Sequence, residues 1–199
     1  MTNTFWNERY SQSEYVYGEL PNAFFKEILT KLPLGDIILP CDGEGRNAVF
    51  AASKCWKVKA FDLSEAGKIK ADNLALKFGV SIDFQLMDAK MATFEDQSAD
   101  VVALIYTHLP SNVRSILHAN SVKWLKPGGH VILEAFCPDQ IKNTSGGPKD
   151  LDMLYTKEML LNDFKDLRID QLEYKDINLN EGKFHEGRAN VIRMTARKE

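Results

Sequence analysis

The chain has 199 residues, 44% of them hydrophobic and 27% charged, a balance typical of a folded globular protein rather than a disordered or fibrous one. This length suits one domain with a sizeable core. The 25 Lys and Arg against 28 Asp and Glu give a formal net charge of −3, which excludes an overall basic surface and leaves only a local basic patch open. We therefore expect no nucleic acid partner.

The cysteines and the apolar runs indicate the cellular compartment of the protein. Cys41, Cys55 and Cys137 lie far apart without a CxxC pair, so we expect neither a disulfide framework nor a metal site. No apolar run approaches the roughly 20 residues that cross a bilayer, and the N-terminus lacks the pattern of a secretory signal. We expect a cytoplasmic protein without membrane association.

The N-terminal segment, residues 1–34, is rich in aromatic side chains and is predicted to form a lid followed by a helix. Five aromatic residues stand in the first twenty positions without a clear period: Phe5, Trp6, Tyr10, Tyr15 and Tyr17. Further along, Phe25, Ile28, Leu29 and Leu32 recur at helical spacing before Gly35 breaks the pattern.

From residue 35 onward, short apolar runs alternate with helical patterns. The expected strands cover residues 36–41, 58–61, 82–86, 99–105, 130–136, 169–179 and 189–196. The expected helices cover residues 48–55, 64–78, 111–124 and 156–164. Alternation of this kind predicts βαβ units with right-handed crossovers.

The last two strands depart from this alternation, because the short connection 180–187 joins them as antiparallel neighbours. The predicted fold class is α/β. We expect a doubly wound, mostly parallel seven-stranded sheet with one antiparallel strand from a C-terminal hairpin and with helices on both faces. Residues 35–199 would form this Rossmann-like core, and residues 1–199 a single domain.

Ligands of such sheets bind outside the carboxyl ends of the strands. Two motifs stand there: a glycine-containing turn after the first strand and an acid at the end of the second. After the first strand, Gly43 and Gly45 permit a tight bend and a close approach to a ligand, although a simple strand-to-helix turn gives the same pattern. Asp62 ends the second strand, where a carboxylate can accept both hydroxyls of a ribose or can serve as an acid at a helix N-terminus.

Two further segments lie at strand or helix ends. Asp88 follows the third strand and can accept the exocyclic amine of an adenine flanked by Met87 and Ala89, or can be a solvated turn residue. The segment 125–129, Leu-Lys-Pro-Gly-Gly, ends a helix and has a structural role.

Together these residues resemble class I S-adenosylmethionine-dependent methyltransferases, over residues 36 to 136. Within that superfamily, other motifs resemble the small tellurite-resistance or thiopurine-type enzymes. They are Phe5-Trp6, Arg9-Tyr10, Tyr17-Gly18, Pro21-Asn22, Gly43 to Ala48, His108-Leu109-Pro110, Glu181-Gly182, His185 and Gly187.

The resemblance implies S-adenosylmethionine as the cofactor and assigns a role to each motif. The implied cofactor residues are Cys41, Asp42, Gly43 and Gly45 for the methionine part, Asp62 and Leu63 for the ribose, Asp88 and Ala89 for the adenine, and Ile105 and Tyr106 for the methyl end. The sequence departs from the family at two positions, since Cys41 replaces a third glycine and Leu39 replaces an acid.

Methyl transfer from a sulfonium is an in-line displacement that depends on alignment and on exclusion of water. Aromatic faces attract a sulfonium, which makes Tyr17 a predicted catalytic residue beside Tyr106. His108 is the other predicted catalytic residue, as a base or an orienting group, although a structural histidine fits as well. His185 can reach the same mouth, and Arg46 is expected to pair with Glu44 or with solvent.

The predicted function is S-adenosylmethionine-dependent methyl transfer to a small-molecule acceptor. One alternative is an NAD(P)-dependent oxidoreductase, because residues 43–48 also read as GxGxxA with an acid downstream. The other is a non-catalytic cofactor-binding module on the same fold, which the departures at Cys41 and Leu39 keep open.

Overall fold

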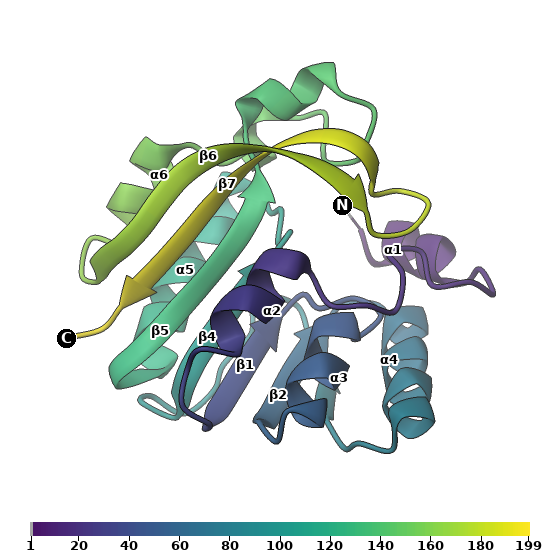
Figure 1. Ribbon diagram of the computed structural model, residues 1–199, viewed down its shortest axis with the longest axis horizontal. Coiled ribbons are helices and arrows are strands. Elements are labelled where there is room, and N and C mark those ends of the chain that lie inside the picture. The colour runs from purple at the N-terminus through teal and green to yellow at the C-terminus, as the bar shows by residue number, and fades with distance from the viewer. Residues whose placement is uncertain (1) are drawn as a thin grey trace.

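A computed structural model gives the fold of residues 2–199, which is built on one seven-stranded sheet of order β3-β2-β1-β4-β5-β7-β6 (Figure 1). The strands are β1 (Asp36–Pro40), β2 (Lys57–Asp62), β3 (Asp83–Leu86), β4 (Ala99–Ile105), β5 (Leu125–Phe136), β6 (Arg168–Asn180) and β7 (Glu186–Arg197). Strands β1 to β5 pair in parallel, whereas β7 pairs antiparallel with both β5 and β6. The predicted fold class, with its antiparallel strand from the terminal hairpin, is confirmed.

Helices cover both faces of this sheet, as predicted (Figure 1). They are α1 (Asn3–Tyr10), α2 (Ala23–Leu29), α3 (Arg46–Ser53), α4 (Glu65–Phe78), α5 (Ser111–Trp124) and α6 (Lys157–Asp163), with short 3-10 turns at Pro138–Lys142 and Leu151–Met153. Because successive side chains of a strand point to opposite faces, Ile37 packs in the core beneath α2, α3 and α4, and Ile38 packs in the core beneath α5 and α6. The sheet is thus buried on both sides, as expected of a parallel sheet.

The N-terminal segment contains a helix that the sequence did not predict. In α1 the Thr2 hydroxyl accepts a hydrogen bond from the Phe5 N–H and caps the first turn. The Asn7 side chain then accepts from the Ser64 hydroxyl at 2.7 Å and from the Ala66 N–H at 3.1 Å, at the start of α4. Helix α1 has only three aromatic residues, Phe5, Trp6 and Tyr10, too few to establish a helical period, so periodicity could not reveal it.

The start of β5 differs from the prediction, whereas α5 covers the predicted residues 111–124. Strand β5 begins at Leu125, directly after α5, and therefore includes the Pro-Gly-Gly segment that was expected to precede it. The N-cap of α5 is Pro110, and the backbone N–H of Ser111 donates to the Asp152 carboxylate at 2.7 Å. Leu125 pairs with Ala99 of β4, a contact that a local sequence pattern does not contain.

The β6–β7 hairpin arches over the carboxyl edge of the sheet, and its turn lies close to α1 (Figure 1). At the turn, the Arg9 guanidinium lies 4.3 Å from the centre of the Phe184 ring. Helix α1 and the hairpin turn therefore meet above the strand ends where ligands of such sheets bind. Among residues 2–199, the helices are too short or too polar to cross a bilayer.

Candidate active site

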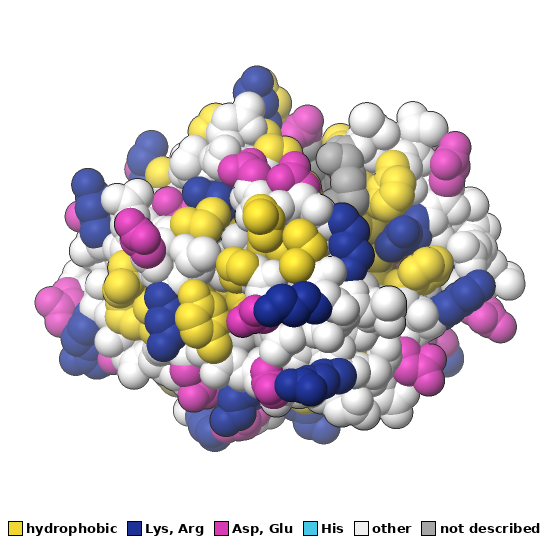
Figure 2. Space-filling view, turned by 90° about the horizontal axis from the view of Figure 1, so that it is seen from above, with side chains coloured by type: hydrophobic (Ala, Val, Ile, Leu, Met, Phe, Trp, Pro, Cys, Tyr) yellow, Lys and Arg dark blue, Asp and Glu magenta, His cyan; other side chains and the backbone are white. Residues whose placement is uncertain are grey.

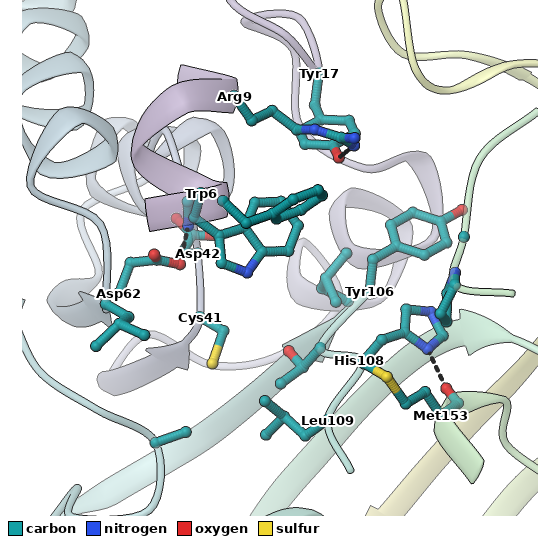
Figure 3. A pocket seen from close by; sticks show the side chains of 18 of the residues that line it. Trp6, Arg9, Tyr17, Cys41, Asp42, Asp62, Tyr106, His108, Leu109 and Met153 are labelled. Atoms are coloured by element: carbon teal, nitrogen blue, oxygen red, sulfur yellow. Dashed lines mark hydrogen bonds between the residues drawn. The ribbon is translucent and has the colours of Figure 1, made fainter. Parts of the chain in front are cut away.

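A cavity of about 580 Å³ lies at the carboxyl ends of the strands, beneath α1 and the hairpin (Figure 3). It brings together eleven of the twelve predicted site residues: Tyr17, Cys41, Asp42, Gly43, Asp62, Leu63, Asp88, Ala89, Ile105, Tyr106 and His108. These residues come from five separate segments of the chain. Their convergence follows from the parallel arrangement, which places the ends of β1, β2, β3 and β4 at one edge.

The bend after β1 requires left-handed backbone at Cys41 and Gly43, whose φ angles are +55° and +57°. At Gly43 glycine is also needed for space, because a Cβ there would lie 2.6 Å from the Tyr10 hydroxyl. Cys41, one of the two departures from the family pattern, adopts this left-handed backbone at a cost of about 1–2 kcal/mol and adds a thiol to the cavity wall. Leu39, the other departure, is buried in the core.

Gly45, the remaining predicted site residue, does not line the cavity. Its φ angle is +81°, and a Cβ there would lie 2.5 Å from the Cβ of Ala71 on α4. The glycine therefore permits close packing of the bend against α4 and does not contact the cavity. The contact with Ala71 supports a packing role for Gly45, and its assignment to cofactor contact stays a prediction.

Asp42 holds the bend against the first turn of α3. Its carboxylate accepts hydrogen bonds from the Ala48 N–H and from the Asn47 side-chain amide, both at 3.0 Å. Burial raises the pKa of Asp42 to about 7, and these hydrogen bonds limit the rise.

Asp62 contacts the glycine bend directly. Its carboxylate accepts from the Gly43 N–H at 3.0 Å and from the Ser64 N–H at 2.9 Å (Figure 3). Burial raises the pKa of Asp62 to about 6. A carboxylate offers about four lone-pair sites, so further donors can bind on the cavity side. Asp62 thus combines the two predicted roles, an acid at a helix N-terminus and an acceptor at the cavity.

The third strand end is more open. Asp88 is exposed, and one of its carboxylate oxygens accepts from the Lys90 N–H at 2.8 Å, which is the turn contact foreseen as the simpler interpretation. Buried Ala89 and half-buried Met87 and Leu63 give this part of the cavity an apolar wall. The segment is therefore a flat apolar slot with a carboxylate at its rim.

Three aromatic rings surround His185 on the other side of the cavity. The imidazole lies 4.5 Å from the Tyr17 ring, 4.6 Å from the Tyr106 ring and 5.3 Å from the Phe136 ring, measured between ring centres. Tyr106 is fixed by its hydroxyl, which donates to Glu134 Oε1 at 2.9 Å. Burial raises the pKa values of Tyr17 and Tyr106, so both phenols stay neutral near pH 7.

His108 lines the cavity, but the backbone uses both of its ring nitrogens. Nδ1 lies 2.6 Å from the Met153 carbonyl oxygen, and Nε2 accepts from the Phe136 N–H at 3.1 Å (Figure 3). Burial lowers the pKa of His108 to about 4, so the ring is neutral. No ring nitrogen is left to take a proton from a substrate. The prediction of a catalytic base at His108 is therefore corrected to a structural histidine, the interpretation left open beside it.

Arg46 pairs with neither Glu44 nor solvent, contrary to expectation. It is buried and forms an ion pair with Glu181 of the hairpin at 2.7 Å. Burial alone would raise the pKa of Glu181, but the contacts with His185 and Arg46 lower it to about 2. Glu181 Oε2 also lies 3.6 Å from His185 Nδ1, so this carboxylate faces the imidazole.

Two further segments complete the walls of the cavity. The roof comes from α1, where Arg9 joins Trp6 and Tyr10, within the N-terminal segment that was predicted as a lid. The other wall is the segment after β5, with Gly147, Pro148 and Met153, which sequence reasoning did not find. Arg9-Tyr10 was visible as a motif, and the Gly-Gly-Pro run signalled an irregular loop. Their meeting at the cavity depended on tertiary structure.

Known proteins resemble this chain in sequence or in fold. Residues 40–129 match the family model described as a methyltransferase domain. This match spans 90 of the 199 residues and supports the predicted resemblance to methyltransferases.

Three solved structures share the fold. A protein studied for the conversion of a disulfide bond into a thioacetal group in echinomycin biosynthesis has a TM-score of 0.80 at 14% identity, covering 99% of this chain and 92% of that one. TehB from Haemophilus influenzae has a TM-score of 0.73 at 16% identity, covering 99% and 67%. An S-adenosylmethionine-dependent methyltransferase from Methanosarcina mazei has a TM-score of 0.67 at 19% identity, covering 86% and 96%. No curated protein matches this chain by sequence.

Proposed function

We propose that this protein is a methyltransferase that binds S-adenosylmethionine along the carboxyl edge of β1 to β4 and transfers its methyl group to a small molecule by in-line displacement. The contact between Asp62 and Gly43 carries the proposal, because it joins an acceptor for ribose hydroxyls to the glycine bend in the cavity wall. The cavity of about 580 Å³ lies within the range of small-molecule sites.

The proposed pose follows the lining of the cavity. Asp62 accepts from the ribose, while Leu63, Ala89 and Asp88 line the adenine slot. Cys41, Asp42 and Gly43 face the methionine part, and Ile105 and Tyr106 face the methyl end. Gly45 supports this pose only by fixing the bend against α4.

The donor supplies a methyl group on a sulfonium, and the sulfur that leaves is neutral, so the protein needs no acid for it. Tyr17 and Tyr106 present aromatic rings near the methyl end, where a cation gains about 0.5–2 kcal/mol. Glu134 holds the Tyr106 hydroxyl, which keeps the ring at a fixed angle. The hairpin and α1 exclude water from the aligned reactants, the condition under which proximity contributes about 7–11 kcal/mol.

An acceptor that loses a proton needs a base, and His185 is better placed for this than His108. Its Nδ1 is buried and faces Glu181 at 3.6 Å, an arrangement that favours the proton on Nδ1 and a lone pair on Nε2. Burial lowers the pKa of His185, so the ring is neutral. We propose His185 as the residue that accepts or steers the proton of a protic acceptor.

The acceptor proposed here is a small molecule. A geranyl diphosphate methyltransferase in complex with GPP and sinefungin shares the fold, which supports a small-molecule acceptor for this chain. Figure 2 shows the face above the cavity, where charged side chains of both signs are interspersed and Lys and Arg form no continuous stripe. This distribution does not favour a nucleic acid acceptor.

Calorimetry with S-adenosylhomocysteine tests the site. Wild type should bind, and Asp62→Ala should weaken binding at least tenfold, the expected effect of losing hydrogen bonds to a charged group. Asp176→Asn, an exposed hairpin change at the ion pair with Arg188, serves as the control and should leave the affinity unchanged. Equal affinities of wild type and Asp62→Ala would refute the proposed pose.

Two further measurements separate the alternatives. Titration of a reduced nicotinamide cofactor, read by its fluorescence, should give no signal. A screen of thiols, selenium and tellurium oxyanions and thiopurines should yield S-adenosylhomocysteine with at least one acceptor. Donor binding without product across the panel would favour a non-catalytic module.

The remaining expectations from the sequence belong to the same proposal. We propose one domain over residues 1–199 and a cytoplasmic location, for which the three unpaired cysteines, Cys41, Cys55 and Cys137, give support.

A further inference from the structure

Arg9 is held in the roof of the cavity without an acidic partner. Its Nη1 donates to the Tyr17 hydroxyl at 3.0 Å (Figure 3). Its guanidinium carbon lies 4.7 Å from the Phe5 ring centre and 4.3 Å from the Phe184 ring centre. The cation is therefore fixed by α1 on one side and by the hairpin turn on the other.

The other well-buried cations near the cavity each meet a carboxylate. Arg46 pairs with Glu181 at 2.7 Å, Lys70 with Glu44 at 2.8 Å, and Arg193 with Glu134 at 2.5 Å. For Arg9, no Asp or Glu oxygen of residues 2–199 lies within the 4.0 Å of an ion pair. Glu44 is not available to it, since Lys70 and the Val16 N–H already bind that carboxylate.

A half-buried guanidinium that is held but not neutralised is suited to binding an anion. It has five N–H donors in a planar fork, and the Tyr17 hydroxyl takes one of them. The Phe5 and Phe184 rings pack over the guanidinium, so its N–H donors point outward in the guanidinium plane, away from these rings. Carboxylates and other oxyanions fit that edge with two parallel hydrogen bonds.

We propose that Arg9 is an anion-binding residue of the cavity and that its guanidinium receives a carboxylate or another oxyanion of a bound small molecule. The inference rests on the proposed function and specifies that a bound molecule carries a negatively charged group at this point of the cavity. Two sources offer this chemistry: the carboxylate in the methionine part of the donor, and an anionic group on the acceptor. Both place the negative group under α1 and beside the hairpin turn.

Calorimetry on wild type and Arg9→Gln distinguishes the sources. The probes are S-adenosylhomocysteine, 5′-methylthioadenosine, which lacks the carboxylate, and the anions selenite and mercaptoacetate. If Arg9 binds the donor carboxylate, Arg9→Gln weakens S-adenosylhomocysteine about 10- to 100-fold and leaves 5′-methylthioadenosine unchanged. If Arg9 binds the acceptor, Arg9→Gln binds S-adenosylhomocysteine and 5′-methylthioadenosine as tightly as wild type does. Wild type then binds selenite or mercaptoacetate, and Arg9→Gln does not.

The matched control is Arg188→Gln, which removes an exposed guanidinium from the same hairpin and should change neither binding event. Thermal unfolding compares the stability of the two variants. Should Arg9→Gln fail to fold, Arg9→Lys keeps the charge and the apolar stem but lacks the planar fork, and the same titrations are carried out on it.

The proposal is overturned when wild type and variant bind S-adenosylhomocysteine equally and bind the two anions equally or not at all. Failure of the wild type to bind S-adenosylhomocysteine would instead refute the proposed function. In that case, titration of the anions into the free protein still decides the role of Arg9.

Discussion

The guanidinium of Arg46 lies 2.7 Å from the carboxylate of Glu181, a residue 135 positions further along the chain. Arg46 is the first residue of α3, directly after the glycine bend, and Glu181 stands in the turn of the β6–β7 hairpin. Arg46 also donates to the Tyr17 carbonyl at 3.2 Å. The ion pair thus connects the donor side of the cavity to its roof and to the N-terminal segment.

Removing one partner of this buried pair should destabilise the protein strongly. Arg46→Met leaves the Glu181 carboxylate, which is only 14% exposed, without its counter-ion. We expect the free energy of unfolding to fall by about 3–5 kcal/mol, measured by urea denaturation at pH 7. The double variant Arg46→Met/Glu181→Leu should recover part of the loss. An unchanged midpoint for Arg46→Met would show that the pair contributes no stability.

The affinity for S-adenosylhomocysteine should depend on the protonation of Asp62. Burial raises its pKa to about 6 in the folded protein, so the carboxyl takes up a proton as the pH falls through 6 and loses an acceptor for ribose hydroxyls. Calorimetry should show affinity about tenfold lower at pH 5 than at pH 7.5. Asp62→Asn cannot titrate and should flatten this profile. A profile that is equally steep in Asp62→Asn would assign the dependence to another group, such as Asp42.

A side chain at position 45 should affect folding before it affects binding. In Gly45→Ala the new Cβ would meet the Ala71 Cβ at 2.5 Å, and the left-handed φ of +81° adds strain. We expect the loss in unfolding free energy to be about 2–4 kcal/mol, read from urea denaturation. Gly45→Ala/Ala71→Gly removes the Cβ–Cβ contact and should regain part of it. A fully stable Gly45→Ala with weakened donor binding would favour the predicted assignment of Gly45 to cofactor contact.

His108 should contribute stability that is lost in acid. Its folded pKa of about 4 lies below the usual value near 6.5, so the unfolded chain binds a proton first as the pH falls. The contribution is complete above pH 6.5 and declines toward pH 4. His108→Leu leaves the Phe136 N–H and the Met153 carbonyl without partners and should be less stable at pH 7. The stability gap between wild type and variant should narrow by about 2 kcal/mol at pH 4.5. Parallel curves would contradict a buried neutral His108.

Much of the fold could be predicted because its signals are local. The apolar run 99–105 and the helical spacing around Ala71 and Leu74 each predicted an element that the structure contains. The acid at the end of β2 and Gly43 after β1 lie together in the cavity wall, since parallel strands place their carboxyl ends at one edge. Helix α1 escaped prediction because its buried contacts, with α4 and the cavity, are with residues far along the chain.

The sequence by itself determined the order of strands and helices, the glycine bend and the acids at its rim, because each depends on the conformational preference or the spacing of neighbouring residues. Only the tertiary structure decided which side chains are free to act. It engaged both nitrogens of His108 with backbone groups, moved Gly45 to a helix contact, and gave Arg46 a partner in the hairpin. Hydrogen bonds and charges in a buried site are satisfied by whatever group the fold brings near, and that group is set by packing rather than by distance along the chain.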